Sequence, residues 1–489
     1  MEAEPKDWLD YLAHIWHILV ALFTVFIAVV TSCHAILHKR DTRAAVMWVA
    51  LSWLVPLIGP VLYITFGINR IRIRANQLRA AQPRYQTQAG QLAEQEYPLD
   101  TVAREMPSLA PLARLVNVTT HQPLLAGNSV DPLINGDAAF PAMIAAIDSA
   151  QQSVTFVTYI FDPGKAGNQF LDAFVRAMKR GVDVRVLIDD TGARYSWPSI
   201  VPKLKKAGIR VARFLPTSVP VRAMAINLRN HRKILVIDGL TAFTGGMNIR
   251  DGHLLKQSPK RPVQDVHFRL TGPVVGYLQE VFADDWMFCT REELRGEKWF
   301  PHLTETGPVL ARCVPDGPDD NFEKIRWVIL GAVSCAQKRI RIMNPYFLPD
   351  RGLISALNVA AMRGVQVDII IPQVNNLPFV HWAMMAQLWQ LLECGCRVWL
   401  TQPPFDHSKL MIVDGEWSFI GSSNFDPRSL RLNFELNVEC YCTKLSSELE
   451  AHIEGKLAKA HQLTLREVDA RPLLIKLRDG VARLLTPYL

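Results

Sequence analysis

The chain has 489 residues, of which 49% are apolar and 20% charged, with 54 Lys and Arg residues against 46 Asp and Glu residues. This composition excludes a disordered, collagen-like or disulfide-framework protein, and the length is sufficient for more than one hydrophobic core. The formal charge of +8 is divided evenly: residues 1–84 carry nine basic and five acidic side chains, and residues 85–489 carry 45 and 41. The nearly balanced larger part argues against a nucleic-acid-binding protein.

Two long apolar runs lie near the N-terminus. Residues 18–37 contain no Asp, Glu, Lys or Arg over 20 positions, and residues 44–67 contain none over 24. Each run is long enough to cross about 30 Å of hydrocarbon as a helix. Pro56 and Pro60 give the second run a kinked or re-entrant path as an alternative to a straight span. The acidic N-terminus and the second run exclude a cleavable secretory signal, so residues 1–74 are predicted to form a two-span membrane hairpin.

The charges beside these runs predict on which side of the membrane the remaining chain lies. The connection between the runs, residues 38–43, holds three Lys and Arg residues. The basic residues that follow the second run are Arg70, Arg72, Arg74 and Arg79. Because the cytoplasmic flanks of membrane helices carry the excess of Lys and Arg, we expect a multi-pass protein of the cytoplasmic (inner) membrane whose larger part is cytoplasmic. The same arginines can hold anionic lipid head groups.

The remaining chain contains a repeat. Residues 75–120 are polar and predict a linker with some helix. Beyond them, helical runs that end in Gly are followed by strands rich in Val and Ile, which is typical of βαβ units on a parallel or mixed sheet. The pattern occurs twice: residues 180–188 match 363–371, and residues 207–211 match 394–398. We therefore expect two tandem α/β domains, residues 121–300 and 301–489, that face each other about a pseudo-twofold axis.

Each copy carries one motif of chemically active residues at the same spacing. The motifs are His231, Lys233, Asp238 and Asn248 in the first copy and His407, Lys409, Asp414 and Asn424 in the second. A set of this kind at fixed offsets arises by chance on the order of once per million positions. Its occurrence once in each copy indicates a function, whereas salt bridges between the two domains are the structural alternative.

The spacing also predicts the local geometry of each motif. A His and a Lys at positions i and i+2 of a strand point to the same face. The Asp follows the strand in a turn, where its carboxylate is expected to bond to backbone N–H groups. The Asn follows the returning strand, where its amide can hold an oxygen atom of a ligand. Two such sets around a small anion suit phosphodiester transfer without a metal, so we predict that the His, Lys and Asp residues form the catalytic set and that the Asn residues bind phosphate.

The doubled H-x-K-x₄-D pattern resembles the phospholipase D superfamily. Further segments are similar to the bacterial cardiolipin synthases: LVPLIGPVLYITFG in the second apolar run, NPYFLPD at 344–350, GSSNFDPRSLRLNFELN at 421–437 and the ending RDGVARLLTPYL. The resemblance covers the chain from about residue 120 to the end, together with the N-terminal runs. It implies one active site at the interface of two α/β domains, in which Glu435 orients His407 and Asp265 orients His231.

The resemblance also implies a reaction. One His takes the phosphatidyl group of a phosphatidylglycerol and a second phosphatidylglycerol accepts it, which gives cardiolipin and glycerol without a cofactor. The resemblance assigns the nucleophile to His231 and the general acid and base to His407. Three alternatives remain: a membrane-bound phospholipase D that passes the group to water, a nuclease of the same superfamily, and a non-catalytic membrane scaffold. The small net charge of residues 85–489 disfavours the nuclease, and two complete motifs disfavour the scaffold.

Two patterns outside the motifs also carry predictions. Cys394 and Cys396, like Cys440 and Cys442, have C-x-C spacing rather than the C-x₂₋₄-C spacing of zinc sites. We therefore expect neither zinc nor disulfides, and a reducing compartment. Residues 474–489 have apolar side chains at helical spacing with basic residues between them, which predicts either a helix on a lipid surface or a helix packed on the core.

Overall fold

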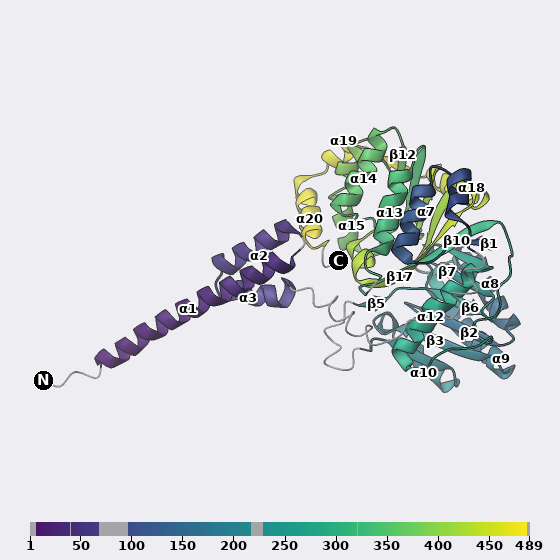
Figure 1. Cartoon of the computed structure of the whole chain (residues 1–489), viewed down its shortest axis with the longest axis horizontal. Helices are drawn as coiled ribbons and strands as arrows, with labels where there is room; N and C mark the ends of the chain where they lie inside the picture. The colour runs from purple at the N-terminus through teal and green to yellow at the C-terminus, as the bar shows by residue number, and fades with distance from the viewer. Residues whose placement is uncertain (1–5, 40, 68–95, 217–227, 320, 487–489) are drawn as a thin grey trace. The chain divides into compact units, whose positions relative to one another are not determined.

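The structure is a computed structural model that describes residues 6–39, 41–67, 96–216, 228–319 and 321–486 (Figure 1). It divides into two compact units, Met1–Ile73 and Arg74–Leu489. The arginines that predict the membrane orientation, Arg70, Arg72, Arg74 and Arg79, lie outside the described residues.

The first unit is built on one long apolar helix. Helix α1 (Lys6–His38) begins well before the predicted run, and its segment Tyr11–His38 is long and apolar enough to cross a membrane. The next helix, α2 (Thr42–Leu54), is capped by Asp41, whose side chain accepts hydrogen bonds from the first backbone N–H groups of the helix. An acid at this position satisfies donors that a helix start leaves free, so the chain turns sharply between the two helices.

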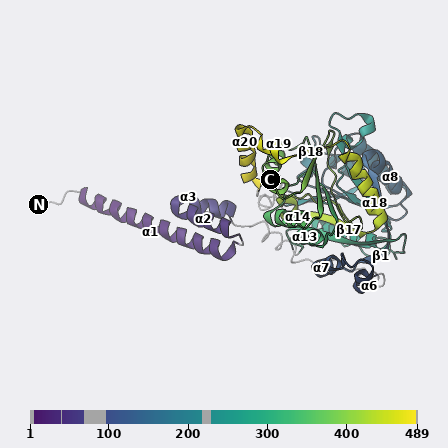
Figure 2. The same ribbon diagram turned by 90° about the horizontal axis from the view of Figure 1, so that it is seen from above.

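The second apolar run is not one continuous helix. Its helix α2 has 13 residues, about 20 Å, which is shorter than the hydrocarbon core of a bilayer. The helix ends just before Pro56, and the short helix α3 (Ile58–Leu62) packs against its last turns (Figure 2). The approach is so close that a Cβ on Gly59 would clash with the Leu51 carbonyl oxygen. A π-helical turn (Tyr63–Gly67) completes the run. Among the described residues α1 is the one candidate span, so the predicted two-span hairpin is not confirmed.

The second unit contains a mixed sheet in which two sets of strands mirror each other. From the centre outwards the order is β1, β9, β7, β6, β2, β3, β4 in the first copy and β10, β17, β16, β15, β11, β12, β13 in the second. The central strands β1 and β10 pair antiparallel, and the outer three strands of each copy run parallel. Each of these seven strands in the first copy has an equivalent at the same place in the order of the second copy. The predicted α/β fold with two related domains is therefore confirmed.

The strands of the two copies follow the same order in the sequence, and four of the seven equivalent pairs have equal lengths: β3 and β12, β4 and β13, β6 and β15, β7 and β16. Those of the first copy are β1 (Leu125–Ile134), β2 (Ser153–Thr158), β3 (Asp183–Asp189), β4 (Arg210–Phe214), β6 (Ile234–Ile237), β7 (Thr241–Gly245) and β9 (Val266–Thr271). Those of the second are β10 (Val309–Asp316), β11 (Arg339–Met343), β12 (Gln366–Pro372), β13 (Arg397–Thr401), β15 (Leu410–Val413), β16 (Trp417–Gly421) and β17 (Asn433–Tyr441), with β18 (His461–Leu463) beside β13. Three short strands are β5 (Arg229–Asn230), β8 (Val263–Gln264) and β14 (Phe405–Asp406).

Helices cover both faces of the first copy's sheet, as the alternation of its buried residues requires. In β2, Val154 and Phe156 belong to the apolar core, whereas Thr155 lies on the other face and donates to Gln279 of α12 at 2.8 Å. The helices of this copy are α8 (Asn135–Ser149), α9 (Lys165–Lys179), α10 (Val201–Lys206) and α12 (Val274–Thr290).

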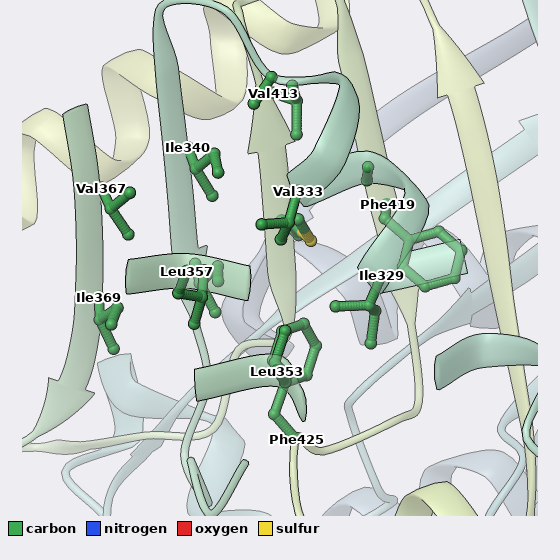
Figure 3. Packing of buried hydrophobic residues seen from close by; sticks show 14 of the residues in the cluster. Ile329, Val333, Ile340, Leu353, Leu357, Val367, Ile369, Val413, Phe419 and Phe425 are labelled. Carbon is green, nitrogen blue, oxygen red and sulfur yellow. The ribbon is translucent and has the colours of Figure 1, made fainter. Parts of the chain in front are cut away.

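The second copy has the same arrangement. Ile340 of β11 and Val367 of β12 share an apolar core with Val333 of α13 (Figure 3), whereas the neighbouring Arg341 donates from Nη2 to Glu454 of α18 at 3.0 Å. The helices of this copy are α13 (Lys324–Cys335), α14 (Arg351–Met362), α15 (Pro378–Met385), α16 (Trp389–Leu392), α17 (Pro427–Arg431), α18 (Thr443–Leu457), α19 (Leu465–Asp469) and α20 (Leu473–Leu484).

Part of the predicted linker belongs to this second core. Its helices are α6 (Leu99–Glu105) and α7 (Ala110–Thr120), while residues 68–95 lie outside the described residues. Leu112 and Val116 of α7 are fully buried, and a Cβ on Gly331 of α13 would lie 3.2 Å from Leu112. The two helices agree with the expected helix in this segment, and the apolar side chains that α7 presents at i, i+4 spacing pack on the core of the second copy.

Candidate active site

The two motif histidines lie where the two copies of the α/β repeat meet. His231 follows the short strand β5, which pairs with β17 of the second copy, and its backbone N–H donates to the Phe434 carbonyl at 2.9 Å. His407 follows the equivalent strand β14, which pairs with β8 of the first copy, and its N–H donates to the Gln264 carbonyl at 2.8 Å. The histidine of each copy therefore follows a short strand that pairs with a strand of the other copy.

The carboxylates beside these histidines come from the opposite copy. His231 Nδ1 lies 3.0 Å from Glu435 Oε2, and His407 Nδ1 lies 2.8 Å from Asp265 Oδ2. The two acids that the resemblance implied are thus next to the histidines, but the expected pairs Glu435–His407 and Asp265–His231 are wrong. The exchange of short strands explains the difference, because it carries each histidine next to the acid of the other copy.

Burial sets the charge state of both imidazoles. Each histidine is 8% exposed. Burial lowers the pKa of His231 to about 4, against the opposing charge of Glu435, and burial together with the charge of Lys409 lowers the pKa of His407 well below its ordinary value. Both rings are therefore uncharged at neutral pH. An Nδ1–H that donates to a carboxylate leaves the Nε2 lone pair available to attack an electrophile or to accept a proton.

The motif lysines repeat one arrangement. Lys233 Nζ donates to the His231 carbonyl at 2.6 Å, and Lys409 Nζ donates to the His407 carbonyl at 2.6 Å. Burial lowers the pKa of Lys233 to about 7 and that of Lys409 to about 8. The charge of Lys409 also acts on His231, and that of Lys233 acts on His407, so the two motifs form one electrostatic environment. Two ammonium groups in this buried place favour an oxygen-rich anion between them.

The two motif aspartates lie away from the histidines. Asp238 accepts hydrogen bonds from the backbone N–H groups of residues 151–153, and Asp414 accepts them from those of residues 337–339. Each follows a four-residue strand, so about 16 Å of extended chain separates it from the motif lysine. The expected bonds to the backbone are present and hold each aspartate at the far end of its strand; a catalytic role for Asp238 and Asp414 stays a prediction.

The two motif asparagines differ in what they offer to a ligand. Asn248 accepts a hydrogen bond from the Ile160 backbone N–H at 3.1 Å through Oδ1, which leaves its Nδ2 as a donor. Asn424 donates from Nδ2 to Ser429 Oγ at 3.3 Å, and its buried Oδ1 has no partner. Asn248 therefore suits the predicted contact with a phosphate oxygen, whereas Asn424 presents an acceptor. Within the described part of the chain, no three His, Cys, Asp or Glu side chains are placed to hold a metal ion.

Comparison with known proteins agrees with this geometry. The family "Cardiolipin synthase, PLD-like domain" matches residues 143–286 and 329–457, which include both motifs. The chain belongs to the cardiolipin synthase family. A second family, "Phospholipase_D-nuclease N-terminal", matches residues 18–67.

Relatives of the cardiolipin synthase family match nearly the whole chain. It is 30% identical to the major cardiolipin synthase ClsA of Bacillus subtilis (strain 168), over 96% of this chain and 99% of the relative. It is 32% identical to cardiolipin synthase A of Pseudomonas fluorescens (strain SBW25), over 95% and 96%. The crystal structure of phosphatidylserine synthase from Haemophilus influenzae Rd KW20 has a similar fold, with a TM-score of 0.61 and 17% identity over 77% of this chain and all of that one.

The hydrogen-bond donors around the two acids distinguish the halves of this cardiolipin synthase family member. Glu435 accepts hydrogen bonds from Ser422 Oγ at 2.5 Å, Ser429 Oγ at 2.8 Å and Asn433 Nδ2 at 3.1 Å. Burial opposes its ionisation, but the interaction with His231, the charge of Lys233 and the hydrogen bond from Ser422 hold the pKa of Glu435 below its ordinary value. Asp265 accepts from the Val266 backbone N–H at 2.8 Å, and burial raises its pKa to about 6.

These supporting side chains were not predicted from the sequence. The Gly-Ser pair of the second motif, against Gly-Gly in the first, was the one available signal: its serine, Ser422, is a donor to the acid. Two aromatic rings were also missed. Tyr159 lies edge-on to His231 with ring centroids 5.0 Å apart, and Tyr346 lies edge-on to His407 at 6.0 Å. Each tyrosine ring therefore covers one side of an imidazole.

Proposed function

We propose that the protein is a phosphatidyltransferase that makes cardiolipin and glycerol from two phosphatidylglycerol molecules through a covalent phosphatidyl-histidine. The observation that carries the proposal is the pair of buried, uncharged imidazoles, His231 and His407, each held at Nδ1 by an acid of the other copy. Membership of the cardiolipin synthase family supports the choice of phosphatidylglycerol among phosphodiesters.

In the first half-reaction, Nε2 of His231 attacks the phosphorus of the donor lipid, and the bond from phosphorus to the glycerol oxygen breaks. The bound phosphodiester anion favours the imidazolium form of His407, which gives its proton to the departing oxygen. Lys233 and Lys409 neutralise the oxygens that share the charge of the transition state, with Asn248 as a further donor. Glycerol leaves, and the phosphatidyl group stays on nitrogen.

In the second half-reaction, His407 accepts the proton of a hydroxyl group on a second phosphatidylglycerol. The hydroxyl oxygen attacks phosphorus, the phosphorus–nitrogen bond breaks, and His231 returns to its uncharged form. The product is cardiolipin. Because the phosphohistidine retains the free energy of the broken ester, the exchange needs no nucleotide or other cofactor.

The difference between the two acids supports His231 as the nucleophile. A phosphatidyl group on Nε2 gives the imidazole a positive charge while Nδ1–H still donates to the acid. Glu435, which is kept ionised by its donors, stabilises that charge. Asp265 has its pKa raised to about 6 by burial, so the proton between it and His407 moves more easily, as a general acid and base requires.

We further propose that the protein lies in the cytoplasmic membrane with its second unit on the cytoplasmic side. Helix α1 is long enough to anchor it. The break of the second apolar run beside Pro56 favours a re-entrant segment over a straight second span. The arginines of residues 70–79 in the sequence favour a cytoplasmic flank that binds anionic head groups.

The test is the product of the purified full-length protein given phosphatidylglycerol labelled in its acyl chains and in its free glycerol, with lipids separated by chromatography. Cardiolipin and free glycerol in equal amounts are expected. The His231→Ala protein is the control, since it keeps the fold but has no nucleophile. Phosphatidic acid as the only labelled lipid product would contradict the transferase and identify a phospholipase D that uses water.

A further inference from the structure

A third basic side chain lies on the same face of the chain as the catalytic His and Lys. Arg229 of β5 precedes His231 by two residues, so in an extended chain it points to the same side, about 6.6 Å away along the strand. The residues between them point the opposite way, because Asn230 Nδ2 and Arg232 Nη1 both donate to the buried Asp285. Arg229, His231 and Lys233 therefore follow one another along the wall of the site.

Arg229 forms no ion pair with a described acid, although burial raises the pKa of the nearby Asp189 and the charge of Arg229 acts to lower it. Its Nη1 donates to Tyr159 OH at 3.0 Å, and that tyrosine ring contacts His231. Its Nε is buried without a partner among the described residues. The carboxylate of Asp189 is turned to backbone N–H groups, including that of Asn230. A partly buried guanidinium whose nearest partner is a neutral hydroxyl has room for an anion.

A second arginine reaches the same place from the other copy. Arg428 belongs to α17, the helix whose Ser429 donates to Glu435 of the active site. Burial, and then the charge of Arg229, lowers the pKa of Arg428, while the charge of Asp426 raises it, and Tyr159 also interacts with it electrostatically. The two guanidinium groups, one from each half, therefore act on each other near the ring that contacts His231. A phosphate bound to both would offset the repulsion between them.

We propose that Arg229 and Arg428 bind the phosphate of the acceptor lipid, while the motif lysines hold the phosphate that is transferred. This inference rests on the proposed function and names the subsite that selects its second substrate. In phosphatidylglycerol the attacking hydroxyl oxygen and the lipid's own phosphate are joined through three carbons, roughly 6 Å from bond lengths of about 1.5 Å. The offset of Arg229 from His231 along the chain is of the same order, so an acceptor phosphate on the arginines leaves its hydroxyl within reach of the phosphohistidine. Arg suits this role because its planar fork binds two phosphate oxygens.

If the arginines form this subsite, their replacement should change how the phosphatidyl-enzyme divides between two acceptors, phosphatidylglycerol and free glycerol. Free glycerol has no phosphate, so it accepts the group without using the arginines, whereas phosphatidylglycerol uses them. Full-length protein is given donor phosphatidylglycerol together with labelled glycerol, and the rates of cardiolipin formation and of glycerol exchange are measured side by side. In Arg229→Gln and in Arg428→Gln the ratio of cardiolipin to exchange is expected to fall about 10- to 100-fold, the loss of a hydrogen bond to a charged group. Arg229→Lys is expected to recover part of the ratio.

The matched control is Arg431→Gln, which removes a half-exposed arginine of the same helix that pairs with Glu323. Its ratio is expected to equal that of the wild type. An unchanged ratio in the Arg229 and Arg428 variants, or an equal loss of both reactions, would overturn the acceptor subsite while cardiolipin synthesis by the wild type still stands. A wild-type protein that exchanges glycerol but makes no cardiolipin would instead overturn the proposed function.

Discussion

The different roles proposed for His231 and His407 follow from the neighbours of their acids, since the two motifs have the same spacing. Ser422 donates to Glu435 and helps to keep it ionised. The equivalent residue of the first copy is Gly246, and a Cβ there would lie 2.7 Å from an oxygen of Asp265. A serine cannot take this place unless the acid moves. The serine at position 422 therefore helps Glu435 to stabilise a positive charge on His231. The glycine at position 246 leaves His407 next to Asp265, an acid whose pKa is raised to about 6 by burial.

This division of roles predicts where a trapped intermediate forms. The His407→Ala protein lacks the general acid, so a phosphatidyl substrate whose leaving group needs no proton should react once and stop. Mass spectrometry of the digested protein should then find the phosphatidyl adduct on His231. The reciprocal His231→Ala protein should carry no adduct. An adduct on His407 in that protein, with none in the first, would reverse the two roles.

The lysines predict how activity depends on pH. In the empty site, burial places the pKa of Lys233 at about 7 and that of Lys409 at about 8, so both lose their charge as the pH rises through this range. Because kcat/KM reports the free enzyme, it should fall between about pH 7 and 8. A bound phosphodiester anion favours the ammonium form, so the fall in kcat should occur at higher pH. Both profiles are measured with the same lipid dispersion. A kcat/KM that stays constant to about pH 9 would contradict the argument.

At the scale of elements, the sequence predicted those parts that depend on local pattern. The repeated strands and the turn that holds Asp238 follow from periodicity and spacing, and they are present. The exchange of β5 and β14 between the copies has no local signal, since each strand is two residues long and its partner lies far away in the sequence. The pairing of His231 with Glu435 depends on that exchange, so it could not be predicted from spacing alone. The burial of α7 was missed for the same reason, because its partner, α13, lies more than 200 residues later.

Helix α20 bears on both of the hypotheses made for residues 474–489, the helix on a lipid surface and the helix packed on the core. The helix packs on α15 through one face, where Asp479 and Ala482 are buried and Arg471 donates to Asp479 at 2.8 Å. Its apolar side chains instead point outwards and are mostly exposed: Leu473, Leu474, Leu477, Val481, Leu484 and Leu485. Lys476 and Arg483 flank this stripe. An apolar stripe between basic side chains is the pattern of a helix that lies in the interface of an anionic bilayer.

We therefore expect α20 to contact lipid in the full-length protein. With the protein in vesicles that contain a photoactivatable phospholipid, mass spectrometry should find lipid adducts on α20. The Leu474→Gln, Leu477→Gln protein should lose most of them, because each leucine contributes about 1.5–3 kcal/mol when it is fully buried in hydrocarbon. Val359→Gln on α14 is the control, since that side chain is also about half exposed, at 52%, but lies on another helix. Equal labelling of α20 in all three proteins would contradict a lipid-facing role.

At the scale of the second unit, the two copies hold each other's active residues and neither copy contains a complete site. The sheet runs through both copies at the β1–β10 pair, so their separation would also expose two long strand edges. The α/β repeat is therefore one cooperative structure with one active site. The residue between His231 and Lys233 also joins the two copies, because it contacts a buried acid of the first copy and the backbone of the second.

Arg232 is that residue, and we expect its replacement to cause a large loss of stability. It is 1% exposed, its Nη1 donates to both oxygens of Asp285, and its Nε donates to the Glu435 carbonyl of the other copy at 3.1 Å. Arg232→Ala leaves the Asp285 carboxylate buried without its cation, which should lower the free energy of unfolding by about 3–5 kcal/mol. Arg269→Ala is the control: Arg269 is half exposed and pairs with the exposed Asp131, so its loss should lower that free energy by about 1 kcal/mol or less. Guanidinium unfolding of the full-length proteins in detergent, followed by tryptophan fluorescence, measures both.

Because the same arginine holds the backbone of Glu435, activity in Arg232→Ala should be lost at denaturant concentrations where the wild type and Arg269→Ala remain active. Equal unfolding midpoints for the two variants would show that the buried arginine does not join the copies.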